Sequence, residues 1–303
     1  MTSLPPSGIQ VELRYGEQRA VIVEAGGGLR SYTLAGRPIL DGYPEEEMAG
    51  GGRGQVLFPW PNRLAGGTWD DDGSRRQLPL SEPTHGNAIH GLVRWSAGDV
   101  RPAGSAGANA RYTLVPQPGF PFRLAIDIDY RLSAGGLAVT TTVRNECARP
   151  APFGLGFHPY LSAGGGLVDD LTLTVPAETH LLLDANGIPS GREPVAGSSV
   201  DYRVARRIGE GVLDDAFTAV QRGEGELAQV TVEGSHGRVE LWAGPGYEYL
   251  QVFTGDTLTS TVRRRGLAVE SMTCPPNALA TGEGLIFLEP AASVELSWGI
   301  TPA

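Results

Sequence analysis

Three short polar motifs carry the residue types that acid–base chemistry requires. They read Pro-Asn-Arg at 61–63, Gly-Phe-His-Pro-Tyr at 156–160 and Ala-Val-Glu-Ser-Met-Thr at 268–273. Each places a charged or titratable side chain beside aromatic, apolar or turn residues. Together they supply the guanidinium of Arg63, the imidazole of His158 and the carboxylate of Glu270. These groups suffice for proton transfer on a polyhydroxylated substrate, provided that the fold brings them together.

Glu270 ends an apolar segment that begins at Gly266. If Leu267 and Val269 face a core, Glu270 lies on the opposite face of the strand. A carboxylate in such a place is unfavourable unless it is paired or functional, and burial raises its pKa toward the range of a general base. The alternative is an exposed or salt-bridged glutamate at a strand end.

Two histidines are candidates for the site. His158 lies in a glycine-rich segment, and Pro159 restricts it to extended conformations, so it is a candidate acid or ligand. The alternative is a core histidine that is bonded to the backbone. His90 follows His85 by five residues, and two histidines so spaced face opposite sides of one unbroken strand. No His-x-His or Cys-x-x-Cys spacing occurs, so we expect no metal site. The alternative for His90 alone is a loop histidine that is bonded to the backbone.

Arg63 follows two prolines and two aromatic residues within 58–62, which stiffen the approach to its side chain. Its fork of donors suits sugar hydroxyls or a ring oxygen, and the alternative is a structural arginine that binds loop carbonyls. Asp214 and Asp215 form an acidic pair in which one carboxylate binds hydroxyls, unless both belong to a polar turn. The segment 70–73 lacks the ligand spacing of a calcium loop and predicts a hairpin turn.

The composition indicates a globular chain with little room for long helices. Its 303 residues include 43 glycines and 23 prolines, which together make roughly a fifth of the chain. The usual share of the two is about 12%, and both disfavour the interior of a helix. The net charge of −10, from 24 basic and 34 acidic residues, disfavours a nucleic-acid partner. No run approaches the ~18 apolar residues of a membrane span, and residues 1–6 carry no secretory signal, so we expect a cytoplasmic protein with no membrane partner. We interpret the basic run 263–265 as a solvated loop, with a phosphate contact as the alternative.

Alternating polarity predicts antiparallel strands along the chain. Residues 123–132 alternate apolar and polar positions, 133–136 form a turn, and 137–143 continue as a second strand. Similar patterns occupy 9–15, 19–25, 110–116, 227–233, 237–243, 248–254 and 292–300. Many short strands at this spacing predict a sandwich of antiparallel sheets, which we expect to form a single domain over 1–303. One short helix is indicated at 201–208.

The same motifs resemble the aldose 1-epimerase (mutarotase) family, part of the galactose mutarotase-like superfamily. The segments that carry the resemblance are 61–66, 89–91, 156–160, 213–217 and 268–270. They follow the order of the family, and the similarity spans about 20–300. The resemblance implies an all-β fold, a twisted antiparallel β-supersandwich that holds the sugar in a concave cleft.

The resemblance also implies roles for individual residues. Glu270 would be the general base on the C1 hydroxyl, and His158 the general acid on the ring oxygen. The residues that would bind the sugar are Asn62, Arg63, His90 and Asp214. No cofactor is implied, the partner is a small-molecule sugar, and the protein is expected to be a monomer or a homodimer. Ser271 stands where a proline often follows the catalytic glutamate in the branch that this chain most resembles.

The leading hypothesis is interconversion of the α and β anomers of a free aldohexose. A first alternative is a hexose 6-phosphate substrate, which requires cationic side chains at the cleft rim, with Arg94 and the run 263–265 as candidates. A second is a non-catalytic sugar-binding protein on the same scaffold. The presence of both Glu270 and His158 favours an enzyme, because binding alone needs no acid–base pair.

Overall fold

The computed structural model describes residues 4–303, and its regular structure is almost entirely β. Most strands belong to two antiparallel sheets of nine and eight strands. The expectation about the N-terminal segment concerns 1–6, of which 1–3 lie outside the described residues. Within 4–303 no helix has the length and apolar character needed to cross a membrane.

The nine-stranded sheet is built around the hairpin of β12 (Leu124–Ser133) and β13 (Gly136–Asn145). Along β12 every second side chain is buried, which is the pattern of a sheet with one face toward a core. The sheet order is β10-β11-β12-β13-β27-β23-β22-β17-β20. The other strands are β10 (Asp99–Pro102), β11 (Gly107–Leu114), β17 (Thr172–Thr174), β20 (Arg206–Arg207), β22 (Ala228–Gly234), β23 (Gly237–Ala243) and β27 (Ser293–Pro302).

The eight-stranded sheet contains β25 (Leu267–Met272), whose six residues are all buried. Such an apolar run suits a strand that is covered on both faces. The order is β19-β18-β21-β24-β25-β15-β5, and β16 also pairs with β25. These strands are β5 (Val56–Leu57), β15 (Gly156–Phe157), β16 (Tyr160–Leu161), β18 (Ala177–Leu183), β19 (Pro189–Pro194), β21 (Asp214–Val220) and β24 (Tyr249–Phe253).

Smaller elements complete the fold. A four-stranded sheet comprises β1 (Gln10–Tyr15), β2 (Gln18–Val23), β3 (Leu29–Leu34) and β4 (Arg37–Pro38). The two-stranded pairs are β6 (Arg63–Ala65) with β9 (Asn87–Ile89), β7 (Thr68–Asp71) with β8 (Ser74–Gln77), and β14 (Ala151–Phe153) with β26 (Ile286–Leu288). The helical turns are α1 (Ala278–Thr281) and the 3₁₀ segments Val168–Asp170 and Glu224–Glu226.

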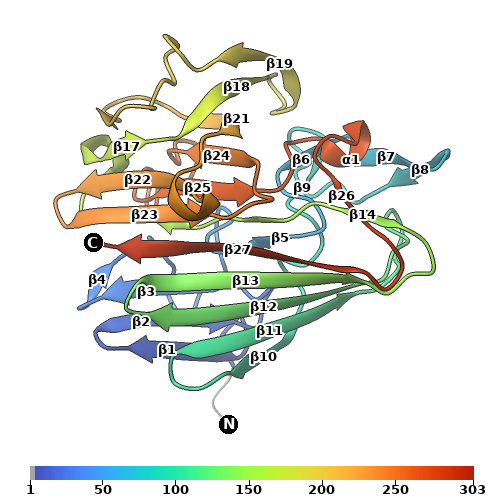
Figure 1. Ribbon diagram of the computed structural model, residues 1–303, viewed down its shortest axis with the longest axis horizontal. Coiled ribbons are helices and arrows are strands. Elements are labelled where there is room, and N and C mark those ends of the chain that lie inside the picture. The colour runs from blue at the N-terminus through green and yellow to red at the C-terminus, as the bar shows by residue number, and fades with distance from the viewer. Residues whose placement is uncertain (1–3) are drawn as a thin grey trace.

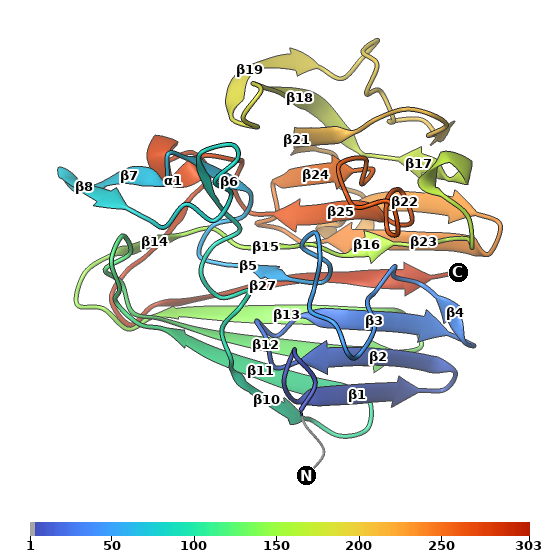
Figure 2. The same cartoon turned by 180° about the vertical axis from the view of Figure 1, so that it is seen from behind.

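The sheets lie in layers with the core between them. In Figure 1 the nine-stranded sheet faces the viewer, and in Figure 2 β1–β3 lie in front of it. The pairs β6–β9 and β7–β8 gather with α1 at one end of the molecule in both views. Phe157 of the eight-stranded sheet contacts Trp298 of β27, with ring centroids 4.9 Å apart, so the two large sheets share one core.

The predicted all-β class is confirmed, and so are the strands. The hairpin predicted over 123–143 is β12–β13, and the seven other predicted segments correspond to β1, β2, β11, β22, β23, β24 and β27. The predicted turn at 70–73 joins β7 to β8, with Asp72 in the left-handed region at φ 51°. Local alternation and turn residues are therefore sufficient to find these elements.

The helix predicted at 201–208 is wrong. The segment is irregular apart from the two residues of β20. Its backbone instead bonds to neighbouring strands, because the Val175 amide donates to the Tyr202 carbonyl and the Ile208 amide donates to Leu171. Burial of Tyr202 and Ile208 accompanies these bonds, so tertiary contacts override a weak helical preference.

Candidate active site

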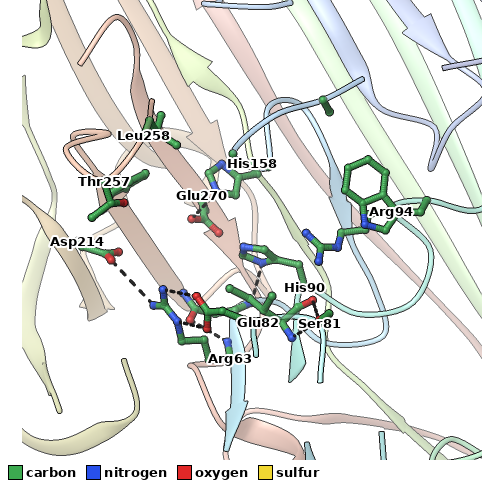
Figure 3. A pocket seen from close by; sticks show the side chains of 17 residues that line it. Arg63, Ser81, Glu82, His90, Arg94, His158, Asp214, Thr257, Leu258 and Glu270 are labelled. Carbon is green, nitrogen blue, oxygen red and sulfur yellow. Dashed lines mark hydrogen bonds and ion pairs between the residues drawn. The ribbon is translucent and has the colours of Figure 1, made fainter. Parts of the chain in front are cut away.

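A cavity of about 270 Å³ contains all six residues that the sequence singled out for sugar chemistry. They are Asn62, Arg63, His90, His158, Asp214 and Glu270. Arg63 begins β6, Asn62 directly precedes it, and His90 directly follows β9. His158 lies between β15 and β16, Asp214 begins β21, and Glu270 lies in β25. Figure 3 shows His158 and Glu270 side by side, with Asp214 and Arg63 on one flank and Arg94 on the other.

The centre of the site is a buried imidazole–carboxyl pair. His158 Nε2 lies 3.3 Å from Glu270 Oε1, and the two side chains are 5% and 3% exposed. Burial, with the charge of Asp214, raises the pKa of Glu270 well above its usual value. Burial, with the positive charges of Arg53 and Arg94, lowers the pKa of His158 to about 3. One proton is therefore held within the pair over a wide pH range, which is the state that paired acid–base catalysis needs.

Strand β25 fixes Glu270, because it is paired on both sides. Gln251 of β24 lies opposite Glu270 in the ladder, while β15 and β16 pair with the other edge. Within the described residues Glu270 Oε2 is buried without a hydrogen-bond partner. An unpaired buried polar atom is unfavourable by about 1–3 kcal/mol, and because Glu270 lines the cavity, a bound ligand could supply the missing partner.

His158 is held by stacking and by close backbone packing. Its ring stacks on the Tyr160 ring at a centroid distance of 5.0 Å. The guanidinium of Arg53 lies over the same Tyr160 ring, 4.4 Å from its centroid. The amide of His158 donates to the Gln55 carbonyl at 3.1 Å. Gly52, at φ 80°, lies so close that a Cβ there would be 2.6 Å from His158 Cδ2. These contacts restrict the position of the imidazole ring.

His90 and Asn62 hold one another through reciprocal hydrogen bonds. The Asn62 amide donates to His90 Nδ1 at 3.2 Å, and the His90 amide donates to the Asn62 carbonyl at 2.9 Å. Both residues adopt positive φ, at 55° and 62°. Since Nδ1 is an acceptor, the neutral ring carries its proton on Nε2. Burial lowers the pKa of His90 well below its usual value, so this residue is a neutral donor rather than a cation.

Arg63 lies at the wall between His90 and Asp214. Glu82 accepts two hydrogen bonds from its guanidinium, at 2.9 and 3.0 Å, and Arg63 Nη1 lies 3.9 Å from Asp214 Oδ2. Gln251 links Asn62 to Asp214, since it accepts a hydrogen bond from Asn62 Nδ2 at 3.3 Å and donates one to Asp214 at 2.8 Å. The charge of Arg63 is therefore balanced, and the fork acts as a fixed set of donors.

The sequence reasoning did not identify Glu82 and Gln251, which form these supports, or Trp95, which lines the cavity. Glu82 stands in a turn-rich segment, 19 residues from its partner Arg63, and no local pattern links the two. Gln251 carries a weak signal, because it is a polar residue in the buried strand β24. Asp215 stays out of this cavity and bonds His180 at 2.8 Å instead.

The interpretation of 263–265 as a solvated loop is wrong for Arg264. This side chain is buried and ion-pairs with Asp169 and Asp256, at 2.8 and 2.7 Å, which offsets the loss of water. Arg263 pairs with Asp256 and Arg265 with Asp41, and none of the three arginines lines the cavity. Among residues 4–303 no three His, Cys, Asp or Glu side chains gather in a way that would hold a metal ion.

Comparison with known proteins gives this family over nearly the whole chain. The model of the aldose 1-epimerase family matches residues 10–300. The chain is 32% identical over 290 residues to the uncharacterized protein YihR of Escherichia coli K12. The aligned region covers 95% of this chain and 92% of that protein.

Solved structures share the fold at lower sequence identity. The GalM/aldose epimerase homologue from C. elegans superposes with a TM-score of 0.85 at 16% identity, over 97% of this chain and 99% of that one. The galactose 1-epimerase from Lactobacillus acidophilus gives 0.79 at 21% identity, over 97% and 94%. With the family match and the whole-length relative, these findings show that the chain belongs to the aldose 1-epimerase family.

Proposed function

We propose that the protein is an aldose 1-epimerase that interconverts the α and β anomers of a free aldohexose by acid–base ring opening and closure. The observation that carries the proposal is the buried pair of His158 and Glu270, 3.3 Å apart on the wall of a polar cavity. A buried carboxyl without a full set of partners is poorly suited to binding alone, but it suits proton transfer.

The chemistry needs two groups with opposite proton states, so ring opening starts from the form in which the proton shared by the pair lies on His158 and Glu270 is ionised. Glu270 takes the proton of the C1 hydroxyl as the C1–O5 bond breaks, and His158 delivers a proton to O5, which gives the open-chain aldehyde. Rotation about C1–C2 then presents the other face of the carbonyl. Reclosure uses the same two groups with their proton states exchanged and yields the other anomer.

The remaining residues orient the sugar. His90 offers its Nε2 proton beside the reacting pair, since its ring centroid lies 5.3 Å from that of His158. Arg63 donates from the wall between His90 and Asp214, and Asp214, whose side chain is 45% exposed, accepts from ring hydroxyls. Asn62 positions both His90 and the start of β6, because its Oδ1 accepts from the Arg63 amide at 2.8 Å.

The test is anomer interconversion of freshly dissolved α-D-glucose and α-D-galactose, followed by polarimetry and NMR. We expect acceleration by the wild-type protein and a loss of roughly 10²–10⁴-fold in Glu270→Gln, because one of the two proton-transfer groups is removed. Glu226→Gln, at an exposed position outside the cavity, is the matched control. Saturable binding of these sugars without turnover would replace the proposal with the sugar-binding alternative.

One observation favours a second substrate, a hexose 6-phosphate. Arg94 lines the cavity on the flank opposite Asp214 (Figure 3), and its guanidinium lies over the Trp95 ring, 5.3 Å from the centroid. Among residues 4–303 no carboxylate forms an ion pair with it. Burial lowers its pKa, so an anion at this place would stabilise its charge. The other three arginines proposed for a phosphate bind aspartates and do not line the cavity, so Arg94 alone of these four candidates reaches it, and the free hexose remains the leading substrate.

Turnover of glucose and glucose 6-phosphate by wild type and Arg94→Gln separates the two substrates. A preference for the phosphorylated sugar that disappears in Arg94→Gln would establish the second. Turnover of glucose alone, unchanged in selectivity by Arg94→Gln, would exclude it.

A further inference from the structure

A buried ion pair lies next to the stacked rings of His158 and Tyr160. Arg53 and Asp41 are 3% and 8% exposed, and Asp41 Oδ2 accepts from Arg53 Nε at 3.1 Å and from Nη2 at 2.8 Å. Arg53 does not line the catalytic cavity, although Gly52 beside it does. A buried ion pair contributes little net stability, because the loss of water offsets most of the attraction. The place of this pair in the molecule therefore bears on its role.

The guanidinium of Arg53 is fixed from several segments. Besides the two bonds to Asp41, Nη1 donates to the Gly50 carbonyl at 3.2 Å and Nη2 to the Val262 carbonyl at 3.3 Å. The Asp41 amide in turn donates to the carbonyl of Tyr160 in β16 at 2.8 Å. Arg53 thus joins the segment before β5, the loop before β25 and the strand that follows His158.

Arg53 reaches the histidine through Tyr160. Its guanidinium carbon lies 4.4 Å from the centroid of the Tyr160 ring, and that ring stacks on the His158 ring at 5.0 Å with 10° between the planes. The Tyr160 hydroxyl donates to the Gly51 carbonyl at 2.6 Å, and the Gly54 amide donates to the His158 carbonyl at 2.9 Å. The segment that carries Arg53 is therefore bonded to both members of the stack.

The charges that face His158 come from four directions. Glu270 of β25 lies 3.3 Å from Nε2, the neutral His90 ring lies 5.3 Å away, and Arg94 stands on one flank of the cavity (Figure 3). Burial is the largest cause that lowers the pKa of His158, and the charges of Arg53 and Arg94 add to it. A cation beside an imidazolium makes it a stronger acid, which favours delivery of its proton to O5.

We propose that Arg53 is a positioning residue for the general acid: anchored by Asp41, it holds the Tyr160 ring and the segment 50–54 against His158 and keeps a fixed positive charge beside the imidazole. The inference rests on the proposed function. It gives the buried pair a part in proton transfer at O5 without contact to the sugar. Because Arg53 lies outside the cavity, its loss should lower kcat and leave KM almost unchanged.

Substitutions of Arg53 test the two parts of this role. Arg53→Met removes both the charge and the fork of donors. We expect kcat for glucose to fall roughly 10- to 100-fold with KM within about twofold, and the acid limb of the pH profile to rise by about one pH unit. Arg53→Lys keeps the charge but not the two-point contact with Asp41. It should lower kcat about tenfold and leave the acid limb in place.

Asp41→Asn separates the charge from the packing. It removes a negative charge while Arg53 and Arg265, which also binds Asp41, remain, so the surroundings of His158 become more positive. The acid limb should then stay at its wild-type position or move to lower pH. A pair that served packing alone would let water reach His158 in both Arg53→Met and Asp41→Asn. The limb would then rise in both variants, toward the ordinary histidine value near 6.5.

Arg149→Met is the matched control. Arg149 also lies over an aromatic ring, 4.2 Å from the Phe122 centroid, and binds the buried Asp71 at 2.7 and 2.8 Å. None of these three residues lines the catalytic cavity. Arg149→Met should therefore keep the wild-type kcat and acid limb.

NMR titration of the imidazoles gives a readout that needs no turnover. The chain has five histidines, and the signal of His158 is assigned with His158→Gln. A midpoint that rises in Arg53→Met and not in Asp41→Asn supports the charge contact even if no sugar is epimerised, so failure of the proposed function is distinguishable. An unchanged midpoint in folded Arg53→Met, or a rise in both variants, overturns the inference. Where Arg53→Met does not fold, wild-type kcat in Arg53→Lys overturns it.

Discussion

Arg63 and Glu82 form a two-point ion pair in the wall of the cleft, with Nε to Oε2 at 2.9 Å and Nη2 to Oε1 at 3.0 Å. The pair is mostly buried, at 15% and 19% side-chain exposure. Two parallel bonds fix the plane of the guanidinium, which a single contact would not. Arg63 therefore lines the cavity as a rigid donor whose direction is set by Glu82.

Glu82→Gln should weaken substrate binding, because the amide presents a second donor to the guanidinium and breaks the two-point pair. Hydrogen bonds to charged groups contribute about 1.5–3 kcal/mol, so we expect kcat/KM for glucose to fall roughly 10- to 100-fold, mainly through KM. Steady-state polarimetry measures this, with Glu226→Gln as control. Unchanged KM in a folded variant would show that Arg63 does not depend on Glu82.

Gly52→Ala should impair catalysis through His158. Its Cβ would lie 2.6 Å from His158 Cδ2 and 2.8 Å from Nε2, so the ring must move. Gly36→Ala is a matched control, since Gly36 has a similar φ of 77° and no atom within 4 Å of the added Cβ. Both variants should lose about 1–2 kcal/mol of stability from the left-handed conformation. Only Gly52→Ala should lose kcat, by roughly 10²-fold, and equal activity of the two would contradict the contact.

The pH profile of kcat/KM should be broad on the acid side. The pair holds one proton between the pKa of His158, lowered by burial to about 3, and the raised pKa of Glu270. Activity should thus persist from neutral pH down to about pH 4 and fall on the alkaline side, where the shared proton is lost. NMR exchange rates, with circular dichroism at each pH as a check of folding, measure the profile. An acid limb centred near 6.5 would show that His158 titrates as an ordinary histidine.

Glu270→Gln should stabilise the protein as the pH rises. The unfolded carboxyl loses its proton above about 4.5, whereas burial keeps the native one protonated to a higher pH. Raising the pH through this window therefore favours the unfolded wild type, by up to about 1.4 kcal/mol per pH unit. Urea unfolding of both proteins at pH 4.5, 6 and 7.5 tests this. A stability difference that does not grow with pH would contradict a raised native pKa.

The strands could be predicted from the sequence because their signals are local. Alternation in 123–132 and the turn at 133–136 are properties of neighbouring residues, and β12–β13 reproduces them. The helix prediction for 201–208 was wrong for the opposite reason, since Val175 and Leu171 supply the backbone partners of this segment from distant positions. Burial of Arg264 likewise depends on Asp169, 95 residues away.

The sequence by itself determined the all-β class, the family resemblance and the six candidate side chains, which line one cavity. Residue type and local strand pattern are enough for these, because proton transfer and sugar binding admit few functional groups. The tertiary structure alone decided that His158 and Glu270 meet at 3.3 Å, that Glu82 holds Arg63, and that a second cavity shares lining residues with the first. These depend on how β25, the β6–β9 pair and the β18–β19 turn pack together, and packing between distant segments leaves no periodic trace in a single sequence.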